Sequence, residues 1–148
     1  MIWKPHVTVA AIVEREGKFL LIEEQAEGKV VLNQPAGHLD PGERLIDAVV
    51  RETLEETAWH FRPEALLGVY LWQKPDSDIT YLRFAFTGQL LRHDPGRTLD
   101  HGILRAVWLT AEEIARAADR LRSPQVLRCI DDYRSGKRYP LDALCDLG

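Results

Sequence analysis

Three glutamates lie close together in one short stretch of the chain, at Glu52, Glu55 and Glu56. In a helix, carboxylates spaced i, i+3 and i+4 are neighbours and repel one another, so this cluster weakens the helix that carries it. Carboxylate oxygens are also the ligands that Mg²⁺ prefers, and Mg²⁺ usually keeps positions for water and phosphate. The stretch is therefore a candidate divalent-cation site, and the alternative is a solvated acidic helix face.

The surrounding residues, 43–58, have the periodicity of an amphipathic helix. At about 100° per residue its apolar stripe consists of Leu45, Ile46, Val49, Val50 and Thr53. Glu56 projects into this stripe and Glu52 lies at its edge. Glu55 lies further round, where its i, i+4 spacing from Arg51 permits an ion pair. A buried carboxylate is costly unless it is paired or binds a metal, so the geometry favours the cation site.

The rest of the chain must supply the elements that position this helix. Apolar runs bounded by turn residues predict strands at 6–13, 18–24, 65–73, 79–91 and 103–109, and a short strand that follows the break at 26–30 and ends at about Asn33. The first two should form a hairpin, and Arg62–Pro63 should end the helical region. Thr110 with Glu113, and Ser123 with Pro124, are typical of helix starts at 110–121 and 123–136. This order predicts an α+β fold with mostly antiparallel strands.

Length and composition restrict the class of protein. A chain of 148 residues is expected to form a single domain over 1–148. A net charge of −4 argues against a general nucleic-acid or membrane-surface binder. No apolar run approaches the roughly 18–20 residues of a membrane span, and the N-terminus does not resemble a signal peptide, so we expect a cytoplasmic protein. Cys129 and Cys145 form no metal-binding pattern and are interpreted as structural thiols.

The acidic stretch also resembles a family signature. Its residues follow the pattern G-x5-E-x7-R-E-U-x-E-E-x-G-U of the Nudix box, in which U is bulky and apolar, at Gly37, Glu43, Arg51, Glu52, Glu55, Glu56 and Trp59. Two positions depart from it. Thr53 replaces an apolar residue, and Ala58 replaces glycine, which indicates that the chain leaves the helix without a positive φ. The order of elements resembles the Nudix α/β/α sandwich, a mixed sheet with flanking helices.

The resemblance implies a hydrolase that cleaves a diphosphate linked to another group, with Mg²⁺ as cofactor and Mn²⁺ as an alternative. Segments such as "KPHVTVA", "NQPAGHL" and "YLRF" are similar to one small bacterial phosphatase of the family. That similarity implies nucleoside tri- and diphosphates and thiamin-pathway pyrophosphates as substrates, namely hydroxymethylpyrimidine diphosphate and thiamin pyrophosphate. The alternatives are a Nudix-fold ligand sensor without catalysis and a hydrolase of another nucleoside diphosphate such as ADP-ribose.

Residue roles follow from the same resemblance. Metal ligands are expected at the carbonyl of Ala36, at the three glutamates Glu52, Glu55 and Glu56, and at a remote carboxylate, for which Asp100 is preferred over Asp94. Glu52 is favoured over Glu56 as the base that deprotonates water. Arg51 is expected to orient the glutamates. Gly37 and Glu43 are expected to support the metal ligands without binding the metal themselves.

Substrate contacts are predicted on looser grounds. Arg83 interrupts an apolar strand and is interpreted either as a fork for phosphate oxygens or as an exposed-face arginine. Trp72 is a candidate for ring stacking, with a core position as the alternative. His38 and Lys4 are candidates for phosphate contact, and the simpler interpretation of Lys4 is a free lysine. The expected partner is a small phosphorylated molecule, with no nucleic acid and no membrane, bound by a monomer or homodimer.

Overall fold

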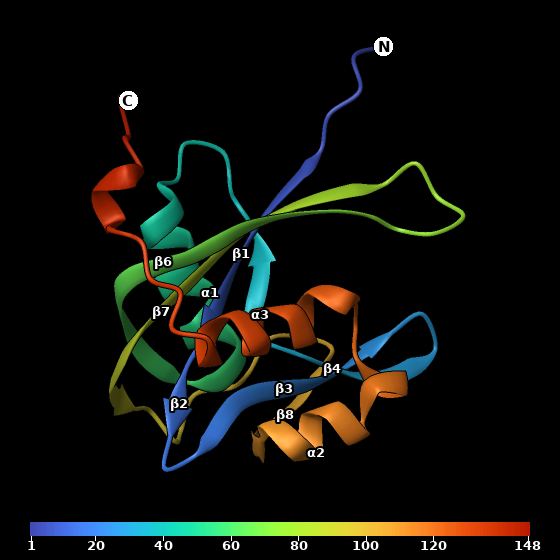
Figure 1. Cartoon of the computed structure of the whole chain (residues 1–148), viewed down its shortest axis with the longest axis vertical. Coiled ribbons are helices and arrows are strands. Elements are labelled where there is room, and N and C mark those ends of the chain that lie inside the picture. The colour runs from blue at the N-terminus through green and yellow to red at the C-terminus, as the bar shows by residue number, and fades with distance from the viewer.

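Two four-stranded sheets with helices on either side make up the computed structural model, which describes residues 1–148 (Figure 1). The strands are β1 (His6–Ile12), β2 (Glu14–Arg15), β3 (Lys18–Ala26), β4 (Lys29–Asn33), β5 (Ala36–His38), β6 (Trp59–Gln73), β7 (Thr80–His93) and β8 (Ile103–Thr110). The helices are α1 (Leu45–Thr57), α2 (Ala111–Arg116) and α3 (Pro124–Arg134), with 3₁₀ turns η1 (Ala118–Arg120) and η2 (Leu141–Ala143). The predicted α+β class is confirmed. None of the helices combines the length and apolar content that a membrane crossing requires.

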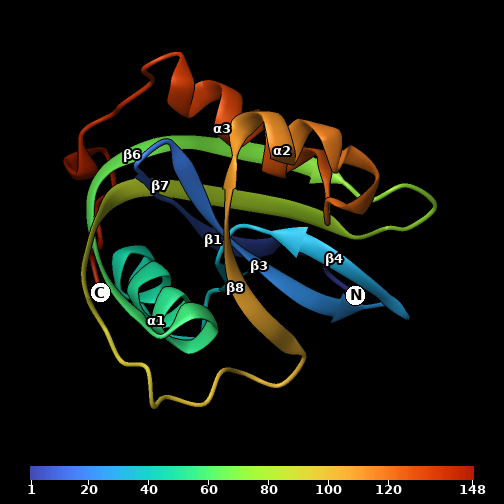
Figure 2. The ribbon, with the colours of Figure 1, turned by 90° about the horizontal axis from the view of Figure 1, so that it is seen from below.

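The first sheet has the strand order β5-β1-β7-β6, and the second contains β2-β3-β4 with β8 beside β3. Only the β1–β7 pair is parallel, with Thr8 opposite Arg83. Figure 2 shows α1 on one side of the sheets and α2 and α3 on the other. This arrangement gives the sandwich two cores, one on each side.

Strand β1 contributes to both cores because its side chains alternate between the two faces of the sheet. Ala10 and Ile12 belong to the core on the side of α2 and α3. Val9 and Ala11 belong to the core that packs against α1. Burial on both faces explains why the sequence here is a continuous apolar run instead of an alternating one.

The predicted hairpin between residues 6–13 and 18–24 is wrong. β1 pairs with β5 and β7, in the first sheet. The short strand β2 pairs with β3 instead, and Leu20 N donates to Val13 O at 3.0 Å. The chain therefore crosses from one sheet to the other just before its first turn, because a strand buried on both faces belongs at the centre of a sheet.

Arg62–Pro63 does not separate the helix from the strand predicted at 65–73, because β6 begins at Trp59 and runs through both residues. β6 is an edge strand, so the N–H that Pro63 lacks removes no bond from the interior of the sheet. Pro63 lies opposite Gly88, and the register shifts between Pro63 and Ala65. A side chain at Gly88 would come within 2.0 Å of the carbonyl oxygen of Arg62, so only glycine fits beside this irregularity.

The predicted helix starts at the end of the chain are confirmed. Thr110 Oγ1 accepts from Glu113 N at 3.1 Å, and the Glu113 carboxylate accepts from Thr110 N at 2.9 Å, forming a capping box. Ser123 Oγ accepts from Gln125 N at 3.2 Å at the start of α3. The first of these helices is shorter than predicted, because α2 ends at Arg116 and the chain continues as η1.

The end of α1 corrects a further expectation. Ala58 has φ 64° and ψ 15°, the left-handed conformation, and its N–H donates to Leu54 O at 2.9 Å. This is the helix termination for which glycine is the usual residue. The prediction that alanine marks an exit without positive φ is therefore wrong, and Ala58 is held in a strained conformation by the structure around it.

Replacing Ala58 with glycine should stabilise the protein. The left-handed conformation costs a residue with a Cβ about 1–2 kcal/mol, and part of the relief is offset by the greater freedom of glycine in the unfolded chain. We expect Ala58→Gly to raise the melting temperature by about 1–4 °C, measured by circular dichroism. Ala48→Gly, in the middle of the same helix, serves as the control and should lower it. A lower melting temperature for Ala58→Gly would contradict the assignment of strain.

Candidate active site

Arg51 connects the acidic residues of α1. Its Nε donates to Glu43 Oε2 at 2.7 Å, and its Nη1 donates to Glu52 Oε1 at 2.8 Å and Glu55 Oε1 at 2.7 Å. Its Nη2 also donates to the carbonyl oxygen of His38 at 3.1 Å. One guanidinium thus holds three glutamate carboxylates in place and ties α1 to β5, and the ion pair predicted with Glu55 is present.

A second contact brings the loop before β8 to the same place. Asp100 N donates to Glu55 O at 3.0 Å. Carboxylate oxygens of Glu52, Glu55 and Asp100 all lie within 4.8 Å of one another. The alternative aspartate, Asp94, is instead bonded to His60 at 2.8 Å. The structure therefore places Asp100, and not Asp94, beside the glutamates.

Glu56 lies apart from that group, on the buried side of α1. It is only 7% exposed, and its Oε1 accepts from Ala36 N at 2.8 Å. Ala36 lies in the short strand β5, which the sequence did not predict. Its position is fixed because β5 pairs with β1. Burial raises the pKa of Glu56 to about 9, opposed by the Ala36 N–H and reinforced by the charge of Glu52. At neutral pH this carboxyl group holds a proton unless a cation replaces it.

Gly37 is explained by close packing against Glu52. A Cβ at position 37 would lie 2.2 Å from the Glu52 carboxyl carbon, so any side chain there would displace the carboxylate. Burial raises the pKa of Glu52, and Arg51 opposes the shift. Burial also raises the pKa of Asp100, with Glu55 acting in the same direction. Burial is thus the main cause of both shifts, and the neighbouring carboxylates add to it.

Glu52 and Glu56 line a cavity of about 530 Å³. The predicted site residues that line it are Ala36, Gly37, His38, Glu52, Glu56, Trp72 and Arg83. Four other predicted residues do not line it: Arg51, Glu43, Glu55 and Asp100. Arg51 is paired with Glu43, and Glu55 and Asp100 are grouped with Glu52, which does line the cavity. Lys4 is exposed and is not part of the lining either. The structure thus brings together all the predicted residues except Lys4.

The structure excludes one of the two sequence interpretations of Arg83. It is 4% exposed, so the exposed-face interpretation is wrong. Its two terminal nitrogens are already engaged: Nη1 donates to Gln34 Oε1 at 2.8 Å and Nη2 to Asn33 Oδ1 at 3.0 Å. Sequence reasoning missed these two residues, although the polar pair at the end of an apolar strand was a visible signal.

His38 and Trp72 both have aromatic neighbours in the cavity. His38 Nε2 lies 3.0 Å from His6 Nδ1, and desolvation, followed by the charge of His6, lowers the pKa of His38. The ring of Trp72 stacks on Tyr81 with centroids 5.9 Å apart and an interplanar angle of 15°. Trp72 lies between cavity and solvent, so the alternative of a core tryptophan is not what the structure shows.

Comparison with known proteins decides the family. A family model described as the NUDIX domain matches residues 4–129, which is most of the chain. The chain belongs to the Nudix hydrolase family. The NudJ phosphatases of Shigella boydii serotype 4 and of Escherichia coli K12 are each 44% identical to this Nudix chain over 144 residues, 97% of this chain and 93% of theirs.

The fold comparison agrees with the sequence comparison. A NUDIX hydrolase structure from Nitrosomonas europaea superimposes with a TM-score of 0.94 at 52% identity, covering 97% of each chain. The α/β/α sandwich expected from the Nudix resemblance is therefore confirmed. The departures from the Nudix box, Thr53 and Ala58, are accommodated: Thr53 is fully buried with its hydroxyl donating to Val49 O at 2.7 Å.

Proposed function

We propose that this Nudix enzyme hydrolyses small molecules that contain a diphosphate, with Mg²⁺ as cofactor and release of phosphate. The observation that carries the proposal is the group of three carboxylates within 4.8 Å of one another, at the edge of a cavity lined by Glu52 and Glu56. Nucleoside tri- and diphosphates and thiamin-pathway pyrophosphates are the proposed substrates. The full-length likeness to the NudJ phosphatases supports this choice of reaction.

The residues present fit a hard divalent cation. Their donors are carboxylate oxygens, and Arg51 forms ion pairs with two of them, Glu52 and Glu55. Glu52, Glu55, Glu56 and Asp100, with the carbonyl of Ala36, would hold the cation. When bound, it would neutralise phosphate charge at the reacting centre.

The chain's own side chains would divide the remaining work. We assign Glu52 as the base: a carboxylate oxygen takes a proton from the attacking water as the water oxygen bonds to phosphorus. The P–O bond of the diphosphate breaks, and its electrons pass to the departing oxygen. Arg51 keeps Glu52 and Glu55 in position through its two Nη1 bonds. Glu43 fixes Arg51 in turn, with bonds of 2.7 and 2.9 Å. Neither Arg51 nor Glu43 is required to touch the substrate.

The substrate would lie along the cavity from the glutamates toward Trp72. We assign His38 to phosphate contact and Trp72 to contact with the attached group, since both line the cavity. Arg83 is assigned to shaping the floor, because its terminal nitrogens are bonded to Asn33 and Gln34. Lys4 is left out of this assignment because it is exposed outside the cavity.

The proposal is tested by phosphate release from a small panel, with and without Mg²⁺. The panel holds hydroxymethylpyrimidine diphosphate, thiamin pyrophosphate, nucleoside tri- and diphosphates, and ADP-ribose. We expect Mg²⁺-dependent release from the first three classes, with their relative kcat/KM ranking the substrates. Release from ADP-ribose alone would replace the substrate assignment. Tight binding of one compound without cleavage of any would indicate a ligand sensor.

A further inference from the structure

Two buried side-chain nitrogens have no hydrogen-bond partner, Nε of Arg83 and Nε2 of Gln125. Gln125 is 7% exposed, so water does not readily satisfy its amide. Buried donors almost always have an acceptor, and one without it costs stability. Both residues line the cavity that contains Glu52 and Glu56, so both unmet donors belong to the candidate active site.

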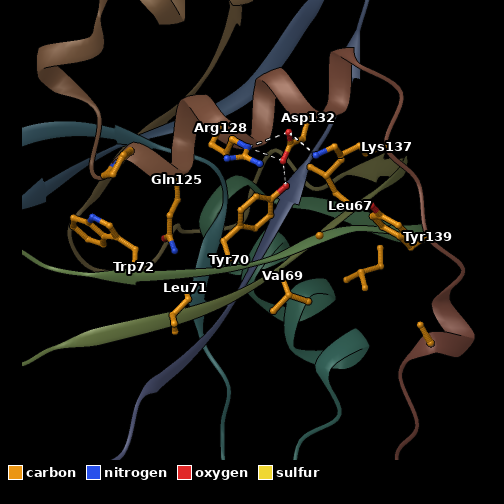
Figure 3. Close-up of a pocket in the computed structure, with 14 residues that line it drawn as sticks. Leu67, Val69, Tyr70, Leu71, Trp72, Gln125, Arg128, Asp132, Lys137 and Tyr139 are labelled. Atoms are coloured by element: carbon orange, nitrogen blue, oxygen red, sulfur yellow. Dashed lines mark hydrogen bonds and ion pairs between the residues drawn. The ribbon is translucent and has the colours of Figure 1, made fainter.

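The position of Gln125 directs its side chain away from the helix backbone. It is the second residue of α3, and its backbone N–H is already bonded to Ser123 Oγ. Figure 3 shows the side chain reaching from α3 toward β6, with its amide between Trp72 and Tyr70. Gln125 and Trp72 also line a second cavity of about 720 Å³, over β6. The amide therefore stands in the wall that the two cavities share.

Neighbouring polar groups, by contrast, are satisfied within the chain. In the second cavity, Asp132 accepts from Tyr70 Oη at 2.7 Å and from Arg128 Nε at 3.1 Å, and lies 3.4 Å from Lys137 Nζ (Figure 3). Gln34, the buried glutamine that accepts from Arg83, donates to Val126 O at 2.9 Å. Gln125 Nε2 has no such partner.

The first cavity also offers a flat wall near this amide. Trp72 and Tyr81 are cross-strand partners on β6 and β7, and their rings stack on each other. An aromatic face of this kind packs against another flat ring, and the edge of such a ring is where its acceptor atoms lie. A flat aromatic wall with a buried N–H donor beside it is suited to a flat ring that has an acceptor atom on its edge.

We infer that Gln125 recognises the ring that the proposed substrates carry: its Nε2 donates a hydrogen bond to an acceptor atom on the edge of that ring while the ring packs on Trp72. Arg83 Nε is a second donor on the same cavity floor. This inference rests on the proposed function and adds to it the residue that selects the substrate. Gln125 is a specificity-determining residue, whereas the glutamates act on the diphosphate that all substrates share.

The test compares ring-bearing and ring-free substrates. Gln125→Leu keeps similar bulk but removes the donor, and Gln125→Glu keeps the shape but replaces the donor with an acceptor. For CTP and hydroxymethylpyrimidine diphosphate, we expect KM to rise about tenfold in Gln125→Leu, the loss of one hydrogen bond, with kcat little changed. Gln125→Glu should lose more. For inorganic tripolyphosphate, neither KM nor kcat should change in Gln125→Leu.

The control and the stability measurement separate recognition from structure. Gln89→Leu, at an exposed position on β7, should leave all substrates unaffected. Gln125→Leu should melt about 2–4 °C higher than the wild type, because it removes an unpaired buried donor. A lower melting temperature, or an equal loss for ring-bearing and ring-free substrates, would show a structural role and overturn the inference.

Calorimetric titration distinguishes failure of this inference from failure of the proposed function. If the wild type cleaves nothing yet binds CTP or hydroxymethylpyrimidine diphosphate about tenfold more tightly than Gln125→Leu, the inference holds and the hydrolase proposal fails. If the wild type cleaves both compounds and Gln125→Leu does so with unchanged KM, the inference fails and the hydrolase proposal holds. Absence of wild-type binding to either compound would also overturn the inference.

Discussion

Glu52→Gln is expected to lose Mg²⁺-dependent turnover by about 10²–10⁴-fold, the usual contribution of a positioned proton acceptor. Glutamine keeps the size of the side chain and its contact with Arg51, but it neither accepts the water proton nor carries the charge that holds a cation. Glu56→Gln should lose turnover to a similar degree, because it removes a buried ligand beside Ala36. Phosphate release under saturating Mg²⁺ measures both losses.

Both variants should remain folded, because each replaces a carboxyl group by an amide of nearly the same shape. Circular dichroism and thermal unfolding check this. Glu64→Gln is the matched control, since Glu64 is exposed on β6 and only contacts Arg62 and Gln89 at the surface. It should keep the wild-type rate. Full rates in Glu52→Gln and Glu56→Gln would show that the site assignment is wrong.

The second large effect concerns the stability of the metal-free protein at alkaline pH. Burial raises the pKa of Glu56 from 4.5 to about 9. The folded protein therefore holds this proton more tightly than the unfolded chain does. The stabilisation that results is complete below pH 4.5 and is lost as the pH rises toward 9. Each pH unit in that window costs at most about 1.4 kcal/mol of unfolding free energy.

Urea unfolding in the presence of a chelator, at pH 6 and pH 8.5, measures this loss. The wild type should lose up to about 3 kcal/mol between the two values. Glu56→Gln should lose much less and be the more stable protein at pH 8.5, because its side chain does not titrate. The difference between the two proteins cancels the titration of the histidines. Parallel pH profiles for the two would contradict a protonated Glu56.

Adding Mg²⁺ at pH 8.5 provides a further arm of the same experiment. A ligand that binds only the folded state stabilises it, and a cation replaces the proton on a carboxyl group. Mg²⁺ should therefore restore more stability to the wild type than to Glu56→Gln, which keeps only the carboxylates of Glu52, Glu55 and Asp100. An equal response of both proteins would show that Mg²⁺ does not stabilise the fold through the Glu56 carboxyl group.

The acidic helix was predictable because its information is local. The helical period alone placed Glu56 inside the apolar stripe, and the structure finds it buried. The spacing of Arg51 and Glu55 alone indicated their ion pair. Helix caps at Thr110 and Ser123 were readable for the same reason, since each depends on residues within one turn.

Features that depend on distant partners were not predictable in the same way. Arg83 lies in an apolar strand, and whether it is exposed depends on Asn33, Gln34 and Cys129, which come from elsewhere in the chain. The partner of β1 was misassigned because adjacency in sequence favours a hairpin, whereas burial of both faces favours a central strand. The strain at Ala58 was missed because the residue type argued against the conformation that the chain adopts.

The parallel pairing of β1 with β7 has a consequence for synthesis of the protein. Thr8 lies opposite Arg83, a separation of 75 residues (83 − 8). At about 5–20 residues per second, the ribosome needs roughly 4–15 s to synthesise the residues between them. During that time β1, a strand buried on both faces in the fold, has no partner on this side, and pairing over such a separation forms slowly. The nascent chain therefore carries β1 with this edge unpaired until β7 has been made.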